Sequence, residues 1–296
     1  MKGLISPRFF VVAAVLAAAG GLVVSATGCG ELSARRKVQE GNKLYKEGKY
    51  ELAIEQFHGA LETSNLEIAQ HNCGLAHLKI FGTSDSSDAR EAHAKRAVEH
   101  FLAYLEKQPK DDKIVSAMIK LYVDSGDYEG AITYWKKQLE IDARNVKALT
   151  ELANINEKAL RFDAALGWHQ KRYEIATTHD DKVNALNSIG SLQFRRLIGD
   201  KDLFGADRLA MADLGIAAFK DAAELQPNNE QLFALQDALY QQRGIATDVS
   251  WAQGVEGTSA LINRLKWRDI FEEKQKASRD ASNEAGSGDQ DTKAER

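Results

Sequence analysis

The stretch Ala34–Glu67 reads ARRKVQEGNKLYKEGKYELAIEQFHGALETSNLE, and its small and aromatic residues indicate two antiparallel helices. Gly41 and Ala53 are small where two closely crossing helices would bring their backbones together. Phe57 is large enough to fill the space between one helix pair and the next. Gly48 separates the two halves, and glycine tolerates the left-handed conformation that commonly ends a helix. We therefore predict a helix pair that turns at Gly48.

Comparable residues follow at similar spacing in four later segments. They are Gly74, Ala97, Phe101 and Pro109 in the second unit; Tyr122, Gly126, Asp127, Tyr128, Ala131 and Trp135 in the third; Leu152, Ala153, Phe162 and Ala165 in the fourth; and Gly190, Gly215, Phe219, Ala222 and Pro227 in the fifth. The frame resembles the tetratricopeptide repeat over roughly Ala34–Gln242, and the fourth unit is the weakest match. The resemblance implies an all-α, right-handed solenoid of about five to six antiparallel helix pairs, closed by a C-terminal capping helix.

Composition agrees with a helical chain. The 296 residues include only 3 prolines, carry a formal charge of −4, and are 44% hydrophobic and 28% charged. No segment alternates at period two for long enough to predict a sheet. A nucleic-acid partner is not expected, because broad binding of DNA or RNA calls for a basic surface.

The first residues are typical of an export signal. Phe9–Thr27 is almost wholly apolar and follows a short basic start, so we assign residues 1–28 to a signal peptide. Ala26-Thr27-Gly28-Cys29 resembles a bacterial lipobox, which implies cleavage before Cys29, lipidation of its thiol and a short tether over 29–33. An uncleaved inner-membrane anchor is the alternative. Gly30 stands where retained lipoproteins carry Asp, which by the same resemblance favours the outer membrane, facing the periplasm.

The remaining chain divides by composition. We predict a repeat domain over 34–245 with insertions near 82–92 and 198–206, each lengthening a helix hairpin. Residues 246–277 form the expected capping helix, and the polar residues 278–296 a disordered tail. The apolar side chains expected to pack in the cap are Leu261, Leu265, Ile270 and Phe271, with Trp251 and Trp267 beside them.

No arrangement typical of catalysis is present in the sequence. It has no phosphate-binding glycine loop, no nucleophile elbow and no zinc-protease histidine pair, so we predict neither an enzyme nor a cofactor. His93 and His100 lie two helical turns apart among charged residues, and we interpret them as a solvated surface, with no metal site. Cys73 lies in an apolar stretch and is expected to be buried.

Binding is therefore the expected activity. Carried over from the tetratricopeptide resemblance, the first helix of each pair lines a groove that holds a peptide or a partner helix. The groove candidates are Asn42, Tyr45, His71, Asn72, Lys113, Lys120, Lys147 and Asn154, with Val38 and Leu75 beside them. Asn42, Asn72 and Lys113 match positions of a clamp for a peptide carboxylate, whereas Val38 and Ala117 fill two further clamp positions without a charge. The asparagines could also simply cap and solvate helices.

Together these features predict a lipid-anchored, periplasm-facing scaffold that binds envelope proteins through its groove and inserted hairpins. It is similar to pilotin-type lipoproteins and to the accessory lipoproteins of outer-membrane assembly, which implies a role in building a pilus, secretion, motility or outer-membrane machine. A periplasmic module that binds a peptide or cell-wall fragment is one alternative, and an inner-membrane-anchored adaptor is another.

Overall fold

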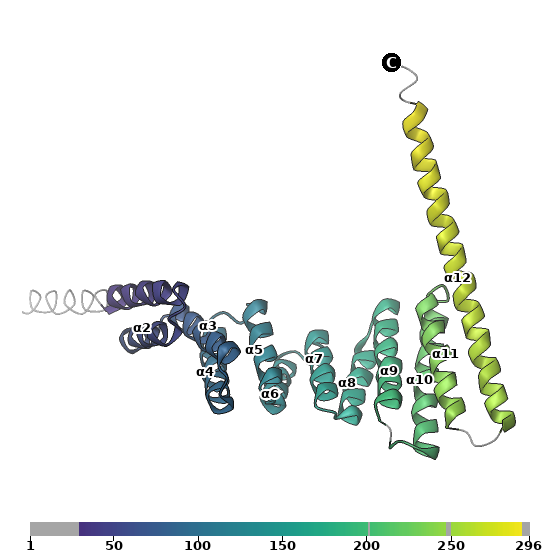
Figure 1. Cartoon of the computed structure of the whole chain (residues 1–296), viewed down its shortest axis with the longest axis horizontal. Coiled ribbons are helices and arrows are strands. Elements are labelled where there is room, and N and C mark those ends of the chain that lie inside the picture. The colour runs from purple at the N-terminus through teal and green to yellow at the C-terminus, as the bar shows by residue number, and fades with distance from the viewer. Residues whose placement is uncertain (1–29, 201, 247–249, 292–296) are drawn as a thin grey trace, which may run out of the picture. The chain divides into compact units, whose positions relative to one another are not determined.

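The computed structural model describes residues 30–200, 202–246 and 250–291, and all regular structure within these ranges is helical (Figure 1). The all-α class and the packing of successive helices are thereby confirmed. The predicted signal peptide and Cys29 lie outside the described residues. The chain divides into two compact units, Met1–Ala131 and Ile132–Arg296, which we describe separately.

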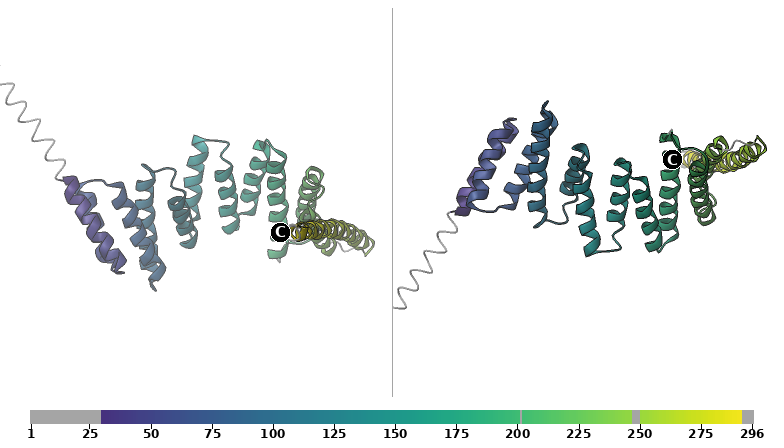
Figure 2. Two further views of the ribbon diagram at one scale, coloured as in Figure 1. Left: turned by 90° about the horizontal axis from the view of Figure 1, so that it is seen from above. Right: turned by 90° about the horizontal axis from the view of Figure 1, so that it is seen from below.

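Unit 1 contains a first helix over residues 30–46 and then four more. They are α2 (Tyr50–Thr63), α3 (Glu67–Thr83), α4 (Ser87–Leu105) and α5 (Asp112–Asp124). Helix α6 (Tyr128–Ile141) runs through the division between the units. In unit 2 the helices are α7 (Val146–Lys158), α8 (Phe162–Ile175), α9 (His179–Gly199), α10 (Gly205–Leu225), α11 (Glu230–Ile245) and α12 (Ser250–Asp291), and Figure 2 shows two further views of them.

The first, second and fifth pairs are each held by a phenylalanine that lies on a glycine. A Cβ added to Gly41 would stand 2.5 Å from a ring carbon of Phe57 in the facing helix. The same geometry joins Gly74 to Phe101, at 2.6 Å, and recurs in the fifth pair. All of these rings are fully buried. The distances are too short for any side chain, so glycine is required for the two helices to approach this closely.

Tight turns follow the first helices where the sequence places glycine. Gly48 has φ +77° and Gly126 has φ +80°, both in the left-handed region.

The insertion near 82–92 is taken up by long helices. Helices α3 and α4 have 17 and 19 residues, against 14 in α2, and Ser86 caps α4 by accepting a hydrogen bond from the Ala89 amide. Helices α9 and α10 have 21 residues each.

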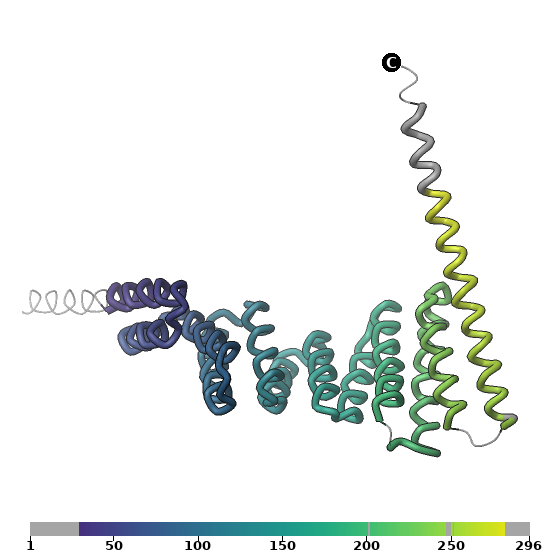
Figure 3. Tube along the Cα trace, viewed as in Figure 1, coloured from purple at the N-terminus to yellow at the C-terminus, as the bar shows by residue number. Residues whose placement is uncertain are grey.

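Helix α12 packs along α11, as the tube in Figure 3 shows, but with another face than the sequence predicted. Its buried residues are Glu256, Ala260 and Asn263. Leu261 and Leu265, expected in the contact, are 50% and 39% exposed. The expectation was wrong because the surface that α12 covers is polar.

Ion pairs and ring contacts hold α12 in place. Glu256, nearly buried, pairs with Arg243 of α11, which also bonds Asp213 of α10 at 2.5 Å. Arg264 pairs with Asp237 at 3.1 Å. Lys274 pairs with Glu230 of α11, and Lys266 lies over the ring of Phe233 in the same helix. Within α12, half-buried Trp267 stacks on Phe271 with ring centroids 5.4 Å apart. The side chain of Trp251 lies outside the described residues.

Two segments expected to be irregular are helical. Residues 30–33, predicted as a tether, belong to the first helix. The expected disordered tail is also wrong as far as Asp291, because α12 continues to that residue. Low apolar content suggested disorder, but a helix already nucleated by packing extends without a further nucleation cost.

Changing Gly74 to Ala should destabilise unit 1 by about 1–3 kcal/mol, because the new methyl group overlaps the Phe101 ring. Gly82→Ala in the same helix is the matched control, since a Cβ there meets nothing within 4 Å. We expect that variant to leave stability unchanged or raise it by up to about 1 kcal/mol. Urea denaturation of the two proteins checks this, and equal midpoints would contradict the packing assigned to Gly74.

The fourth pair departs from the pattern at the aromatic position. His169 of α8 lies four residues after Ala165, as Phe57 lies four after Ala53, and it is 3% exposed. Its Nδ1 has no hydrogen-bond partner. Burial, assisted by the charge of Arg172, lowers the pKa of His169 to about 4. A neutral histidine thus replaces phenylalanine, which explains why this unit matched the repeat poorly.

Because the folded pKa of His169 lies below the ordinary value near 6.5, the unfolded chain binds more protons between these values. The stabilising effect of neutral, buried His169 is complete above pH 6.5 and is lost as pH falls toward 4. We expect the free energy of unfolding to fall by about 1–2 kcal/mol by pH 5 because His169 becomes protonated on unfolding. His169→Leu should reduce the pH dependence of thermal unfolding, and exposed His179→Gln should not. A profile unchanged by His169→Leu would refute the assignment.

A candidate partner-binding face and a histidine–cysteine cluster

The groove positions of the first two pairs are joined by their amide side chains. Asn72 Nδ2, on α3, donates a hydrogen bond to Asn42 Oδ1, on the 30–46 helix, at 2.7 Å. His71 Nδ1 lies 2.7 Å from Asn72 Oδ1. Asn42, His71 and Asn72 are all half-buried. The amides therefore bridge two consecutive helix pairs, and neither caps a helix.

The polar row continues toward α5. The ring of His71 lies 5.1 Å from that of Tyr104, whose hydroxyl donates to Asp111 at 2.9 Å. Asp111 in turn caps α5 by accepting from the amides of Lys113 and Ile114. Partial burial and the bond to Asp111 raise the pKa of Tyr104, so the hydroxyl remains a donor at neutral pH.

The remaining groove candidates lie on separate elements. Tyr45 packs edge-on against Tyr50 with ring centroids 5.2 Å apart. Lys113 and Lys120 are exposed on α5, and Lys120 pairs with Asp124. In unit 2, on α7, Lys147 lies 5.9 Å from the centre of the Trp135 ring, and Asn154 is exposed.

The structure therefore gathers Asn42, His71 and Asn72 but shows no contact between them and the lysines. Val38, expected to line the groove, is buried in the core between the first pair and α3. It cannot contribute to a surface that holds a partner.

A second group of polar residues lies inside unit 1, and the sequence interpretation missed it. His58 of α2, Cys73 and His77 of α3, and His93 and His100 of α4 come together. The interpretation of His93 and His100 as a solvated pair is wrong, because both are half-buried and bond to buried groups. Cys73 is fully buried, as predicted. The spacing of Cys73 and His77, one helical turn apart on one face, was the available signal.

Among the described residues, no helix combines the length and the apolar character needed to cross a bilayer. This finding does not extend to residues 1–29.

No protein-family model matches the sequence, and no curated protein is significantly similar to it. Solved structures with related helix arrangements include a TPR repeats protein from Bacteroides fragilis, with 16% identity, coverage of 70% of this chain and 97% of that one, and a TM-score of 0.45. MamA from Desulfovibrio magneticus has 15% identity, coverages of 67% and 96%, and a TM-score of 0.40. YrrB, described as a TPR protein with an unusual peptide-binding site, has 14% identity, coverages of 66% and 88%, and a TM-score of 0.35. What those proteins bind is not transferred to this chain.

Proposed function

We propose that this chain is a non-enzymatic scaffold that holds a segment of a partner protein against the first helices of unit 1. The observation that carries the proposal is the hydrogen bond between Asn42 and Asn72, which fixes two amides on neighbouring helix pairs. Each carboxamide nitrogen has two N–H groups, and this bond uses one of the four. The others are suited to backbone carbonyls of an extended peptide.

The charge along the same face suggests the nature of the segment. Lys113 is exposed on α5, beyond the row formed by His71, Tyr104 and Asp111. A lysine there favours an acidic side chain or a terminal carboxylate on the bound peptide. Without a second cation at Val38 or Ala117, recognition would depend more on the peptide backbone than on its terminus.

We further propose that the scaffold is exported and anchored by a lipid on Cys29, in the outer membrane and facing the periplasm. The support comes from the apolar stretch Phe9–Thr27 and the lipobox-like residues that follow it. Gly30 is already helical, so unit 1 would begin directly at the lipidated residue. A scaffold held there is suited to assembly of an envelope machine, as in pilotin-type lipoproteins, with its long hairpins offering additional partner surfaces.

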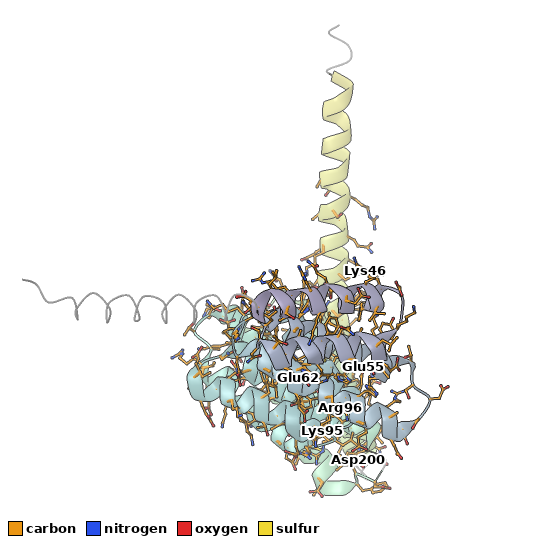
Figure 4. All side chains as sticks on the ribbon, turned by 90° about the vertical axis from the view of Figure 1, so that its left-hand side faces the viewer. Lys46, Glu55, Glu62, Lys95, Arg96 and Asp200 are labelled. Atoms are coloured by element: carbon orange, nitrogen blue, oxygen red, sulfur yellow. The ribbon has the colours of Figure 1, made fainter. Side chains whose placement is uncertain are left out.

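The binding face can be tested with a benzophenone amino acid placed at Lys113 in living cells. We expect a discrete cross-linked adduct, because this position borders the proposed peptide. Exposed Glu55 on α2, labelled in Figure 4, is the matched control on a second helix and should give no such adduct. Adding Asn42→Ala and Asn72→Ala should reduce the adduct about tenfold, given about 0.5–1.5 kcal/mol for each hydrogen bond. If the cross-linker gives the same adduct at Lys113 and at Glu55, or no adduct at Lys113, the proposed face is refuted.

Anchoring can be tested by comparing the full-length protein with its Cys29→Ser variant. The unchanged protein should lose residues 1–28, gain the mass of acyl chains and fractionate with outer membrane, whereas the variant should do none of these. The measurements are intact mass and membrane fractionation. If both proteins keep the apolar N-terminus and remain in the inner membrane, the anchor is an uncleaved helix.

A further inference from the structure

Three helices of unit 1 direct nitrogen and sulfur atoms to one point. The ligand atoms of His58, Cys73, His77 and His100 all lie within 4.8 Å of one another. Cys73 and His77 are fully buried, His100 is half-buried and His58 is exposed. The cluster is therefore enclosed by protein on one side and open to solvent at His58.

The spacing approaches that of a tetrahedral metal site. Ligand atoms around a four-coordinate zinc ion are about 3.3–3.8 Å apart. Cys73 Sγ and His100 Nε2 are already 3.2 Å apart. The ring centroids of His58 and His100 are 5.2 Å apart, and those of His77 and His100 are 5.6 Å apart. The widest pair, His58 and His77, has centroids 6.4 Å apart, so rotation of the exposed His58 would complete the geometry.

Hydrogen bonds orient two of the histidines. His100 Nδ1 lies 2.6 Å from Gln70 Oε1, and since a carbonyl oxygen only accepts, Nδ1 carries the proton. This leaves the lone pair of His100 Nε2 directed toward Cys73. Metal-binding histidines usually donate their second ring N–H in this way.

His77 supplies an independent indication that the cluster binds a ligand. Its Nδ1 lies 2.8 Å from Nδ1 of His93, while its Nε2 is buried without any hydrogen-bond partner. A buried polar atom left unpaired costs about 1–3 kcal/mol, and proteins rarely retain one without a use. If His77 donates from Nδ1 to His93, its Nε2 has a free lone pair inside the cluster.

We propose that His58, Cys73, His77 and His100 bind a transition-metal ion of the Zn²⁺ class, with Gln70 and His93 orienting two of the ligands. Three imidazoles and one thiolate match the ligand preferences of zinc and exclude calcium and magnesium, which take oxygen ligands. Binding forms four metal–ligand bonds, breaks the Cys73 S–H bond and releases its proton to solvent.

Burial and the charge of Arg96 act on the cluster when no metal is bound. Burial raises the pKa of the Cys73 thiol to about 12. Burial, together with neighbouring histidines and Arg96, lowers the pKa of His77 to about 3 and that of His100 to about 4. Arg96 of α4, labelled in Figure 4, opposes a dication, and the thiolate offsets its charge.

The bound ion would connect two helix pairs. His58 belongs to the second helix of the first pair, and the other three ligands belong to α3 and α4 of the second. Cys73 directly follows Asn72, whose amide bonds Asn42 across the same junction. The metal would therefore stabilise the junction on which the amide bridge lies. The metal site itself does not depend on the proposed partner binding.

The test is Co²⁺ titration of the purified full-length protein, alongside Cys29→Ser, in which Cys73 is the only thiol. We expect one ion per chain, thiolate-to-cobalt charge-transfer absorption, tetrahedral visible bands, and displacement of cobalt by Zn²⁺. Zn²⁺ should also raise the unfolding temperature, because it binds only the folded cluster.

The variants separate ligation from folding. Cys73→Ala should abolish the charge-transfer band, and His58→Gln, at an exposed position, should weaken Co²⁺ binding more than about tenfold without unfolding the protein. His179→Gln is the control, because His179 is exposed in unit 2 and is not among the ligands. Absence of the tetrahedral spectrum, its persistence in Cys73→Ala, or equal weakening by His179→Gln would overturn the proposal.

Discussion

In the first, second and fifth helix pairs, a buried phenylalanine ring lies directly on a glycine of the facing helix. The contacts of Phe57 with Gly41 and of Phe101 with Gly74 set the separation between the helices. At this separation no side chain would fit in place of the glycine hydrogen. The hydrophobic and dispersion energy of the ring depends on this contact. The surface that each pair presents to the next follows from that separation, so the amide bridge and the cluster both depend on it.

Both units join successive helices through apolar cores and through polar links. In unit 1, Asn42 bonds Asn72 between neighbouring pairs, and Cys73 contacts His100 within the second pair. Unit 2 has an aliphatic core around Phe219, and ion pairs fasten its last helix. Polar links are directional, and they favour one register between helices more strongly than aliphatic contacts do.

Local and repeated contacts could be predicted from the sequence, and long-range contacts could not. The spacing of Gly41, Ala53 and Phe57 predicted a helix pair because both helices lie within one short segment. The histidine–cysteine cluster depends on how α2 meets the α3–α4 hairpin, which the insertion before α4 obscured. The packed face of α12 was missed for a related reason. Its apolar stripe predicts burial only if the covered surface is apolar, whereas Asp213, Asp237 and Arg243 make that surface charged.

The length of α12 has a mechanical consequence. A helix of 42 residues is about 63 Å long, and its described side chains from Phe271 to Ala281 are all exposed. Such a helix works as a stiff spacer, whereas a flexible chain would let its end wander through a wide volume. Anything fastened near its far end would be kept at a set reach from α11, along a direction fixed by the ion pairs at its base.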